Sequence, residues 1–371
     1  MDSKLNFPFY IQLSQVIIGI VGFFFIIYIG QDIIIPIAFG TLIAILLNPL
    51  VYFLTQRKVN RVVAIFLVMF LSLIVAVGLI YFLAVQATSF SSTFPQLQEK
   101  FDIMFKQAIQ WVSETFNLSK STINAWIIKT KNQGINNSTI VIGQTLSTMS
   151  NVIVVLLLLP VYIFMILFYK PLLLDFIAML FPKNQLHTVI EILSETKKLI
   201  QNYLNGLFIE AIIVAVLNSV ALFILGVQYA ILIGIIGALL NVIPYIGGVI
   251  AIAIPILVSL ATQPPITAVY VVFAYLLVQF IDNNYIVPYI VASRVKLNAL
   301  ISIIVVLIGG ALWGVPGMFL FLPITAILKI IFDRIDQLKA IGFLFGDTMP
   351  AMGKEIFKFG AKKTPKPKAT D

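Results

Sequence analysis

The sequence predicts an all-α polytopic membrane protein. We expect six full transmembrane helices, two broken (re-entrant) helical hairpins in inverted orientation, and an extracytoplasmic helical segment. Of the 371 residues, 60% are hydrophobic and only 11% are charged, and the mean hydropathy is +1.06. Soluble domains are about 45–50% apolar and about 25% charged. Whole windows of about 20 residues carry no charge, and a helix of that length crosses a bilayer.

Hydropathy places the full spans in order along the chain. They fall at 10–30, 33–54, 62–86, 152–169, 207–226 and 266–289. The first span is expected to be a retained helix, because it is longer than the apolar part of a signal peptide and lacks a cleavage site with small residues.

Two segments between the spans are amphipathic rather than apolar. In the polar region 87–151, apolar residues recur at helical spacing and form one stripe; they are Leu97, Phe101, Phe105, Ala108, Val112 and Phe116. A helical cap that packs on the bundle outside the membrane is favoured over a separate ligand-binding domain. The segment 183–204 has a similar stripe with Glu and Lys among it, which suits a helix at the membrane surface.

Lysine and arginine in the short loops predict the orientation. The loop with Arg57, Lys58 and Arg61 should be cytoplasmic, and so should Arg294 and Lys296. Both chain termini are then cytoplasmic, and the region 87–151 is outside.

Two further apolar stretches, 229–262 and 298–333, are interrupted by proline and glycine at Asn241–Gly248 and at Gly309–Gly317. Each leg has about 12 to 16 residues, or about 18–24 Å of helix, whereas a full crossing needs about 30 Å. The predicted orientation also returns each stretch to the side where it began. We therefore interpret both as re-entrant hairpins; pairs of longer, tilted spans are the alternative.

Backbone groups freed at such breaks cannot face lipid, so they must be buried in protein or line a wet cavity. A full span followed by a hairpin occurs twice with opposite orientation, which is typical of the inverted repeats of secondary transporters. Simple kinks in ordinary helices are the alternative. The hypothesis assigns a solute site to Asn241, Pro244, Gly247, Gly248, Gly309, Gly310, Gly314, Pro316 and Gly317.

Four polar residues in apolar surroundings are candidates for ion coupling. Asp282, Asn283 and Asn284 lie in the sixth span, where a carboxylate costs about 2.5–3.5 kcal/mol to insert. Asp282 is either an ion or proton site or a helix-end partner of nearby basic residues. Glu210, early in the fifth span, fits a position at the inner headgroups or a proton carrier inside the membrane.

Several classes of function are excluded. The net charge of +9 is explained by basic loops near anionic lipids, so no nucleic-acid partner is expected. With no cysteine and one histidine, neither thiolate metal sites nor a zinc-protease motif is possible. The sequence also lacks a nucleophile-elbow motif and a phosphate-binding loop. We expect no enzyme, no metal and no cofactor.

The C-terminal half carries a set of motifs that resembles a known family. They are Leu225-Gly226-Val227, Ile243-Pro244-Tyr245-Ile246-Gly247-Gly248, Asp282-Asn283-Asn284-Tyr285-Ile286-Val287-Pro288, Ile308-Gly309-Gly310-Ala311-Leu312-Trp313-Gly314-Val315-Pro316-Gly317 and Pro323-Ile324-Thr325-Ala326-Ile327-Leu328-Lys329. The chain is similar to the autoinducer-2 exporter family of permeases. The resemblance implies a secondary transporter of the bacterial inner membrane, with an elevator-like movement and a homo-oligomer, favouring a pentamer. Glu210 matches no motif of the family.

The resemblance implies export of a small polar solute similar to autoinducer-2. A sodium(lithium)/proton antiporter is the first alternative, and a channel or non-transporting scaffold is the second; the expected partners are thus a small polar solute or monovalent cation, and membrane lipids. The predicted organisation is a three-helix membrane part (1–86), the extracytoplasmic region (87–151), the fourth span with the interfacial helix (152–204), a transport core with both hairpins (205–338) and a basic cytoplasmic tail (339–371).

Overall fold

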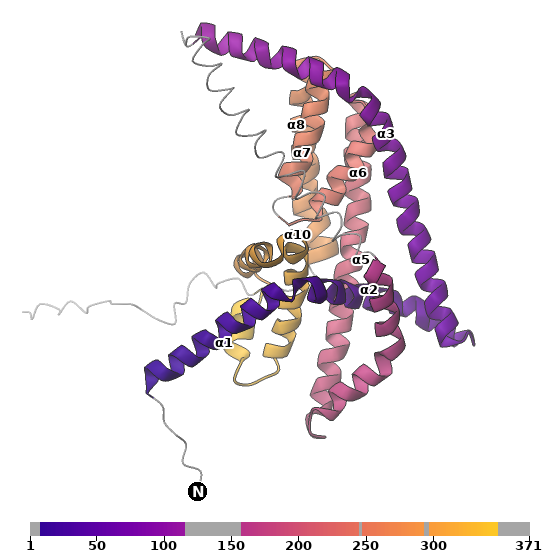
Figure 1. The fold of residues 1–371 in the computed structure, drawn as a ribbon, viewed down its shortest axis with the longest axis vertical. Coiled ribbons are helices and arrows are strands. Elements are labelled where there is room, and N and C mark those ends of the chain that lie inside the picture. The colour runs from indigo at the N-terminus through magenta and orange to yellow at the C-terminus, as the bar shows by residue number, and fades with distance from the viewer. Residues whose placement is uncertain (1–7, 116–156, 245–246, 293–296, 348–371) are drawn as a thin grey trace, which may run out of the picture.

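The structure is a computed structural model that describes residues 8–115, 157–244, 247–292 and 297–347. Within these ranges the chain is helical, with one isolated β-bridge between Leu297 and Gly346. This confirms the all-α class (Figure 1). The elements are α1 (Phe9–Ile29), α2 (Gln31–Gln56), α3 (Arg61–Thr115), an unlabelled helix (Leu157–Met179), α5 (Leu186–Ile224), α6 (Ala230–Asn241), α7 (Gly247–Thr262), α8 (Pro265–Ile281), η1 (Asp282–Ala292), α10 (Ala299–Phe332) and α11 (Lys339–Phe345).

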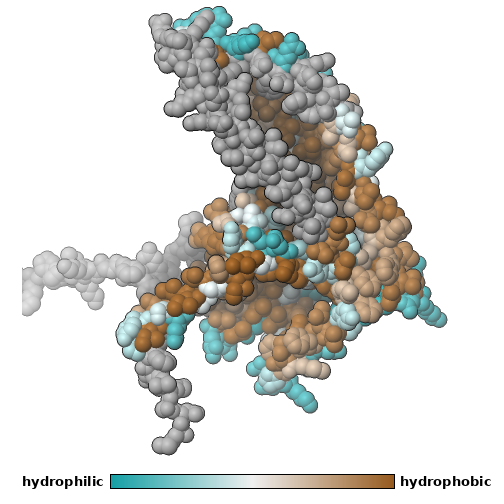
Figure 2. All heavy atoms as spheres, viewed as in Figure 1, coloured by the Kyte–Doolittle hydropathy of each residue, from teal (hydrophilic) through white to brown (hydrophobic). Residues whose placement is uncertain are grey.

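Seven of the described helices are long and apolar enough to cross a membrane. Six of them overlap the six predicted spans, although residues 152–156 of the fourth span lie outside the described residues. The seventh is α10, the second broken stretch, which has this length only when both of its legs are counted. Large apolar side chains cover much of their outer surface (Figure 2). Such a surface is stable when lipid or another apolar surface covers it.

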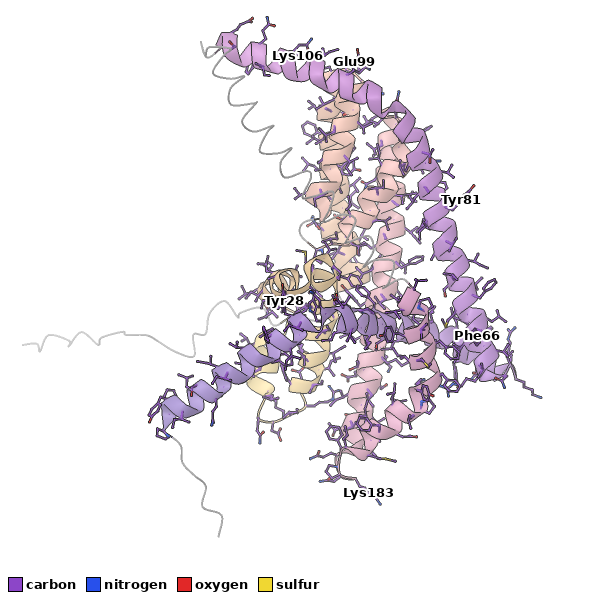
Figure 3. All side chains as sticks on the ribbon, viewed as in Figure 1. Tyr28, Phe66, Tyr81, Glu99, Lys106 and Lys183 are labelled. Carbon is purple, nitrogen blue, oxygen red and sulfur yellow. The ribbon has the colours of Figure 1, made fainter. Side chains whose placement is uncertain are left out.

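Two helices are longer than the sequence predicts. The third span continues into the amphipathic region as one helix, α3, of 55 residues, and the predicted interfacial helix is continuous with the fifth span in the 39-residue α5. At 1.5 Å per residue, α5 is about 58 Å long. The interpretation of 183–204 as a separate surface helix therefore does not match the structure. No proline interrupts α5, whereas α3 bends before Glu99 (Figure 3), near Pro95 in the sequence.

The predicted segments at 116–151 and 348–371 lie outside the described residues, and so do Arg294 and Lys296.

The first broken stretch forms two short antiparallel helices, α6 and α7. With 12 and 16 residues they are about 18 and 24 Å long, as predicted. A left-handed turn at Gly226 and Tyr229 reverses the chain after α5, so α6 packs against α5. Their backbones approach closely because a Cβ on Gly234 would lie only 2.8 Å from the Cα of Ser219. Buried residues of α5, α6, α7 and α8 form one core; they are Leu222, Val227, Ala230, Ile233, Ala251, Val258, Val271 and Tyr275.

The second broken stretch reverses at Gly314, whose φ of 62° and ψ of −143° are open only to glycine. In a straight helix Gly309 and Gly317 would be about 12 Å apart. Instead, a Cβ on Gly317 would lie within 2.6 Å of the carbonyl carbon of Gly309. The outer ends of both α10 legs contact α11 and the residue after it. Asn298 donates to the carbonyl of Gly346 at 3.1 Å, and the ring centroids of Phe332 and Phe345 are 5.9 Å apart.

The turn of this second hairpin packs against α1 and α2. The Trp313 indole donates a hydrogen bond of 3.0 Å to the carbonyl of Ile27, in the last turn of α1. Trp313 and Leu320 share a core with Leu42 of α2 and Ile200 of α5. The two N-terminal helices therefore hold the second hairpin in place.

A third core joins α2, the start of α3 and the helix Leu157–Met179. Pro171 has no N–H to offer to the carbonyl of Leu167, one turn earlier. The Arg61 guanidinium donates to that carbonyl at 2.6 Å instead. Lys170 donates to the Asn48 side chain at 3.0 Å, so polar bonds link all three helices here.

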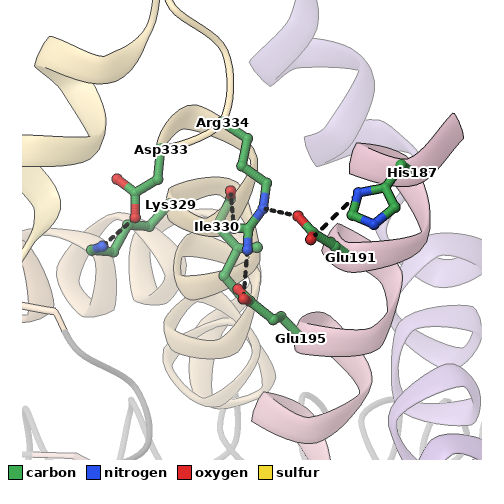
Figure 4. A network of polar contacts seen from close by, with 7 residues as sticks. All are labelled: His187, Glu191, Glu195, Lys329, Ile330, Asp333 and Arg334. Atoms are coloured by element: carbon green, nitrogen blue, oxygen red, sulfur yellow. Dashed lines mark hydrogen bonds and ion pairs between the residues drawn. The ribbon is translucent and has the colours of Figure 1, made fainter. Parts of the chain in front are cut away.

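An ion-pair network links the start of α5 to the end of α10 (Figure 4). Arg334 pairs with Glu195 and Glu191, and His187 lies 3.5 Å from Glu191. These groups are partly exposed, so each pair contributes only about 0–1 kcal/mol. The network fixes where α10 ends relative to α5.

We expect Gly314→Ala to destabilise the protein by about 1–3 kcal/mol, because alanine is strained at this φ and ψ. The matched control is Gly78→Ala, since an added Cβ meets nothing within 4 Å at either position and only Gly314 has a positive φ. Thermal unfolding in detergent measures both. Equal stabilities of the two variants would show that the turn does not depend on glycine.

We expect single cysteines at Lys106 and Lys183 to react from opposite sides of the membrane. The two side chains lie at opposite ends of the molecule (Figure 3), and the charge pattern predicts Lys106 outside and Lys183 inside. The chain has no native cysteine, so a membrane-impermeant maleimide applied to intact cells reports one site at a time. Labelling of both from the same side would refute the predicted orientation.

Candidate functional site

A cavity of about 630 Å³ lies between α5, the α6–α7 hairpin, α8 and η1, with α10 on one side. This volume is in the range of small-molecule sites. Its wall is mainly apolar, with several polar groups. The lining residues are Tyr203, Leu207, Glu210, Asn241, Val242, Pro244, Gly248, Val249, Ile252, Tyr275, Leu276, Gln279, Asp282, Asn283, Val287, Leu297, Ser302 and Leu322.

One hydrogen bond connects the first helix break to the sixth span. Asn241 is the last residue of α6, and its amide nitrogen donates to Oδ2 of Asp282 at 2.8 Å. Asp282 lies where α8 gives way to η1, and it is only 1% exposed. A carboxylate buried this deeply is stable only with such partners or a counter-charge.

The helix is wider at this point because Asp282 begins an 11-residue π-helical segment, η1. The Asn284 amide donates to the carbonyl of Phe280 at 2.8 Å, and Gln279 donates to Asn283 at 3.3 Å. Pro288 within η1 removes a further backbone donor. π-Helical turns are frequent at functional sites, and this one places Asp282 and Asn283 on the cavity wall.

Glu210 also faces the cavity, about two helical turns after Tyr203 on α5. It is 6% exposed, so the structure buries Glu210 and does not leave it at the protein surface. Two carboxylates from different helices thus line one cavity.

The structure brings together only part of the predicted site. Asn241, Pro244 and Gly248 of the first break line the cavity with Asp282, Asn283 and Glu210. Gly247 is buried against the backbone of Leu240, and Asn284 is exposed outside the lining.

The predicted residues of the second break are not among the lining residues. Gly309 and Gly317 pack against each other, Gly310 packs against Met318, and Gly314 and Pro316 lie at the turn beside Trp313. The second hairpin contributes Ser302 and Leu322 from its legs to the cavity. A single solute site formed by residues of both breaks, as predicted from the sequence, would require a different arrangement of α10.

Sequence reasoning placed none of Tyr275, Gln279 and Asn218 in the solute or ion site. A signal for the first two was present, because 275, 279 and 282 follow helical i, i+4, i+7 spacing, which places them on one face of the predicted sixth span. Asn218 is 3% exposed on α5 and carried no comparable pattern.

The described residues contain no group of three or more His, Cys, Asp or Glu side chains placed to hold a metal. The polar groups are carboxylates, amides and phenols. They suit a neutral polar solute or a hard monovalent cation rather than a transition metal.

Seven of the described helices are long and apolar enough to cross a membrane, and the cavity between them carries several polar groups in a mainly apolar wall; these features define a multi-pass membrane protein of the permease class. Residues 17–337 match the family model described as "AI-2E family transporter". The chain belongs to this family, which confirms the resemblance found in the sequence.

Two curated relatives are similar over nearly the whole chain, and a third is similar over part of it. "AI-2 transport protein TqsA" of Escherichia coli K12 is 26% identical over 340 residues, 91% of this chain and 95% of the relative. "Putative transport protein YhhT" of the same organism is 25% identical over 349 residues, 94% and 97% of the two chains. "Putative transport protein YrrI" of Bacillus subtilis is 32% identical over 129 residues, about a third of each chain.

We expect Asn241→Ala to destabilise the protein by about 1–3 kcal/mol, because it leaves the buried Oδ2 of Asp282 without its donor. Asn283→Ala is the matched control, since Asn283 is exposed and its bond is long. Thermal unfolding in detergent compares the two. If both variants unfold at the same temperature, the Asn241–Asp282 bond does not stabilise the junction.

Proposed function

We propose that the chain is a secondary transporter that exports a small polar solute similar to autoinducer-2, by alternating access with an elevator-like movement. The observation that carries this proposal is the cavity of about 630 Å³ between α5, the α6–α7 hairpin, α8 and η1, in a chain whose described residues include seven helices long and apolar enough to cross a membrane. The similarity to the relative named AI-2 transport protein TqsA supports the solute class.

The cavity has the chemistry that such a solute needs. Polyhydroxylated solutes bind through hydrogen bonds to carboxylates and amides, and Glu210, Asp282, Asn241 and Gln279 offer both kinds of group. The absence of a side chain at Gly248 leaves space in the cavity beside Gln279, because an added Cβ would lie 2.8 Å from the Gln279 side chain.

Alternating access requires parts that can move relative to each other. In this proposal, α6–α7 and α10 are re-entrant hairpins that enter the membrane from opposite sides, and the chain termini are cytoplasmic. Both hairpins form part of the cavity wall. The first contributes residues at its break, and the second contributes residues of its two legs. Their short legs, about 18–24 Å in α6 and α7, favour re-entry over a full crossing.

The proposal places the protein in the bacterial inner membrane as a homo-oligomer, with a pentamer favoured. The exposed apolar faces of α1 and α3 are available to lipid and to neighbouring copies. Cross-linking of purified protein in native lipid measures the number of copies directly.

We expect Gly248→Leu to lower solute flux by about tenfold or more, because about 1.4 kcal/mol of lost binding already gives a factor of ten. Uptake of autoinducer-2 into proteoliposomes, with and without a sodium or proton gradient, measures it. The added side chain would occupy the cavity and displace only the ends of flexible side chains. Gly247 and Gly317 are poorer test positions, since a side chain there would collide with backbone.

Gly78→Leu is the control, because Gly78 faces open space. Saturable flux that Gly248→Leu alone reduces would support the proposal. Ion exchange without flux of the solute would favour the antiporter, and ohmic currents would favour a channel. If the purified protein moves neither solute nor ion, a scaffold role is favoured and the proposal fails.

A further inference from the structure

One short helix, α11, joins the two outer ends of the second hairpin. It follows the second leg of α10, and the residue after it returns to the start of the first leg, where Leu297 and Gly346 form the antiparallel β-bridge. At the second leg, Gly342 packs so closely that an added Cβ would collide with the carboxylate of Asp333. The segment therefore closes the hairpin at the end opposite its turn.

Asn298 is the centre of this contact. Its backbone N–H donates to the carbonyl of Phe345 at 3.1 Å. Its side-chain amide donates to the carbonyls of Leu344 and Gly346, at 2.6 and 3.1 Å. Its side-chain oxygen accepts from the backbone N–H of Ile301 at 2.9 Å and so caps α10. One residue thus begins α10 and holds the end of α11.

The same residue connects α11 to the wall of the large cavity. The carbonyl of Asn298 accepts from the backbone N–H and from the hydroxyl of Ser302, both at 3.0 Å. Ser302 lines the cavity, and so does Leu297, the neighbour of Asn298 that forms the β-bridge. A shift of α11 away from Asn298 would therefore change this part of the cavity wall.

α11 is held less firmly than the helices that it joins. Of its seven residues only Gly342 is buried, whereas Phe343 is 71% exposed and Leu344 is 59% exposed. Among the described residues, no ion pair joins α11 to α5 or α10. Segments that bury few apolar side chains open locally at a low cost in free energy.

The second leg of α10, in contrast, is fixed to α5. Arg334, just after this leg, pairs with Glu191 and Glu195 at the start of α5 (Figure 4). The contact around Asn298 is therefore the one that can separate while the second leg stays in place.

We propose that residues 339–346 are a strap that holds the first leg of α10 against the large cavity, with Asn298 as its positioning residue. When the strap opens, Leu297 and Ser302 can move away from the cavity, and a solute can enter or leave on this side. The strap rests on the proposed function, because it controls access to the proposed solute cavity.

Asn298→Asp separates the strap from the helix cap. Aspartate caps a helix as well as asparagine does, but a carboxylate cannot donate to the carbonyls of Leu344 and Gly346. We expect amide hydrogen exchange in α11 of the purified full-length protein to become about two- to tenfold faster, the factor of one net hydrogen bond, with exchange in α5 unchanged. Mass spectrometry of peptides from both helices measures it.

Asn60→Asp is the matched control, because Asn60 caps the start of α3 through its side-chain oxygen. It should leave exchange in α11 as in the wild type. If α11 exchanges as slowly as the buried part of α5, or if Asn298→Asp does not change its exchange, the strap is a static contact and the inference is wrong.

A reversible cross-link tests whether the strap must open for transport. Paired residues of an antiparallel bridge have Cα atoms about 4.5–5.5 Å apart, within the range of a disulfide. An added Cβ on Gly346 meets nothing closer than 3.3 Å, and the chain has no native cysteine. The double variant Leu297→Cys/Gly346→Cys should therefore form one disulfide under mild oxidation.

We expect oxidation of the double variant to lower autoinducer-2 flux in proteoliposomes by about tenfold or more, because the covalent bond prevents an opening that gates the site. Dithiothreitol should restore the flux of the same sample, a reversal that a loss of folding would not give. Leu297→Cys alone, treated with the same oxidant, should keep its flux. Equal flux in the oxidised and reduced states of the double variant would overturn the strap.

The two measurements separate the strap from the transporter. Faster exchange of α11 in Asn298→Asp, without flux in any variant, would keep the opening of the strap and refute the proposed function. Flux that the disulfide does not change would keep the transporter and refute the strap. If one of the two variants does not give a folded, monodisperse protein, the other decides.

Discussion

Backbone groups that leave the helical pattern in or next to a membrane find little water, so the helix breaks described here depend on partners from the protein. Pro171 frees the carbonyl of Leu167, and Arg61 donates to it. The end of α1 exposes the carbonyl of Ile27, and Trp313 donates to that. The break after α6 is tied to the sixth span by Asn241 and Asp282. These three contacts fix how distant parts of the sequence lie together.

The same constraint explains why the polar cavity is where it is. The α6–α7 break, the wide turns of η1 and the buried face of α5 come together, and all three carry polar groups that lipid cannot satisfy. Gathering them around one space costs less than burying each alone. The second hairpin does not expose its break to the cavity. The backbones of its two legs pack against each other at Gly309 and Gly317, and α1 and α2 cover its turn.

Much of the fold could be predicted because its signals are local. Apolar windows gave the six spans, and the Pro/Gly runs located the break after Asn241 and the reversal at Gly314. The continuity of α3 and α5 was missed, because a change from an apolar to an amphipathic pattern was taken as a boundary although nothing stops the helix there.

The site was only partly predictable, because it depends on contacts between residues that lie far apart in the sequence. Asn241, Gly248 and Asp282 stood out as polar or small residues in apolar runs, and the structure puts them on one cavity. That the turn at Gly314 packs elsewhere depends on Trp313 reaching α1, a contact across 286 positions that no local pattern encodes. Asn218 of α5 and Gly237 of α6 line one small void, which exists only because these separate helices pack together.

The position of Trp313 has a practical consequence. Its indole is 7% exposed and bonded to α1, whereas Trp111 is 63% exposed. With Trp111 and Trp126 changed to phenylalanine, the remaining fluorescence would come from the contact between the second hairpin and the N-terminal helices. The fluorescence of a buried, hydrogen-bonded indole differs from that of an indole exposed to water. Trp313 fluorescence would therefore report whether the second hairpin and the N-terminal helices separate.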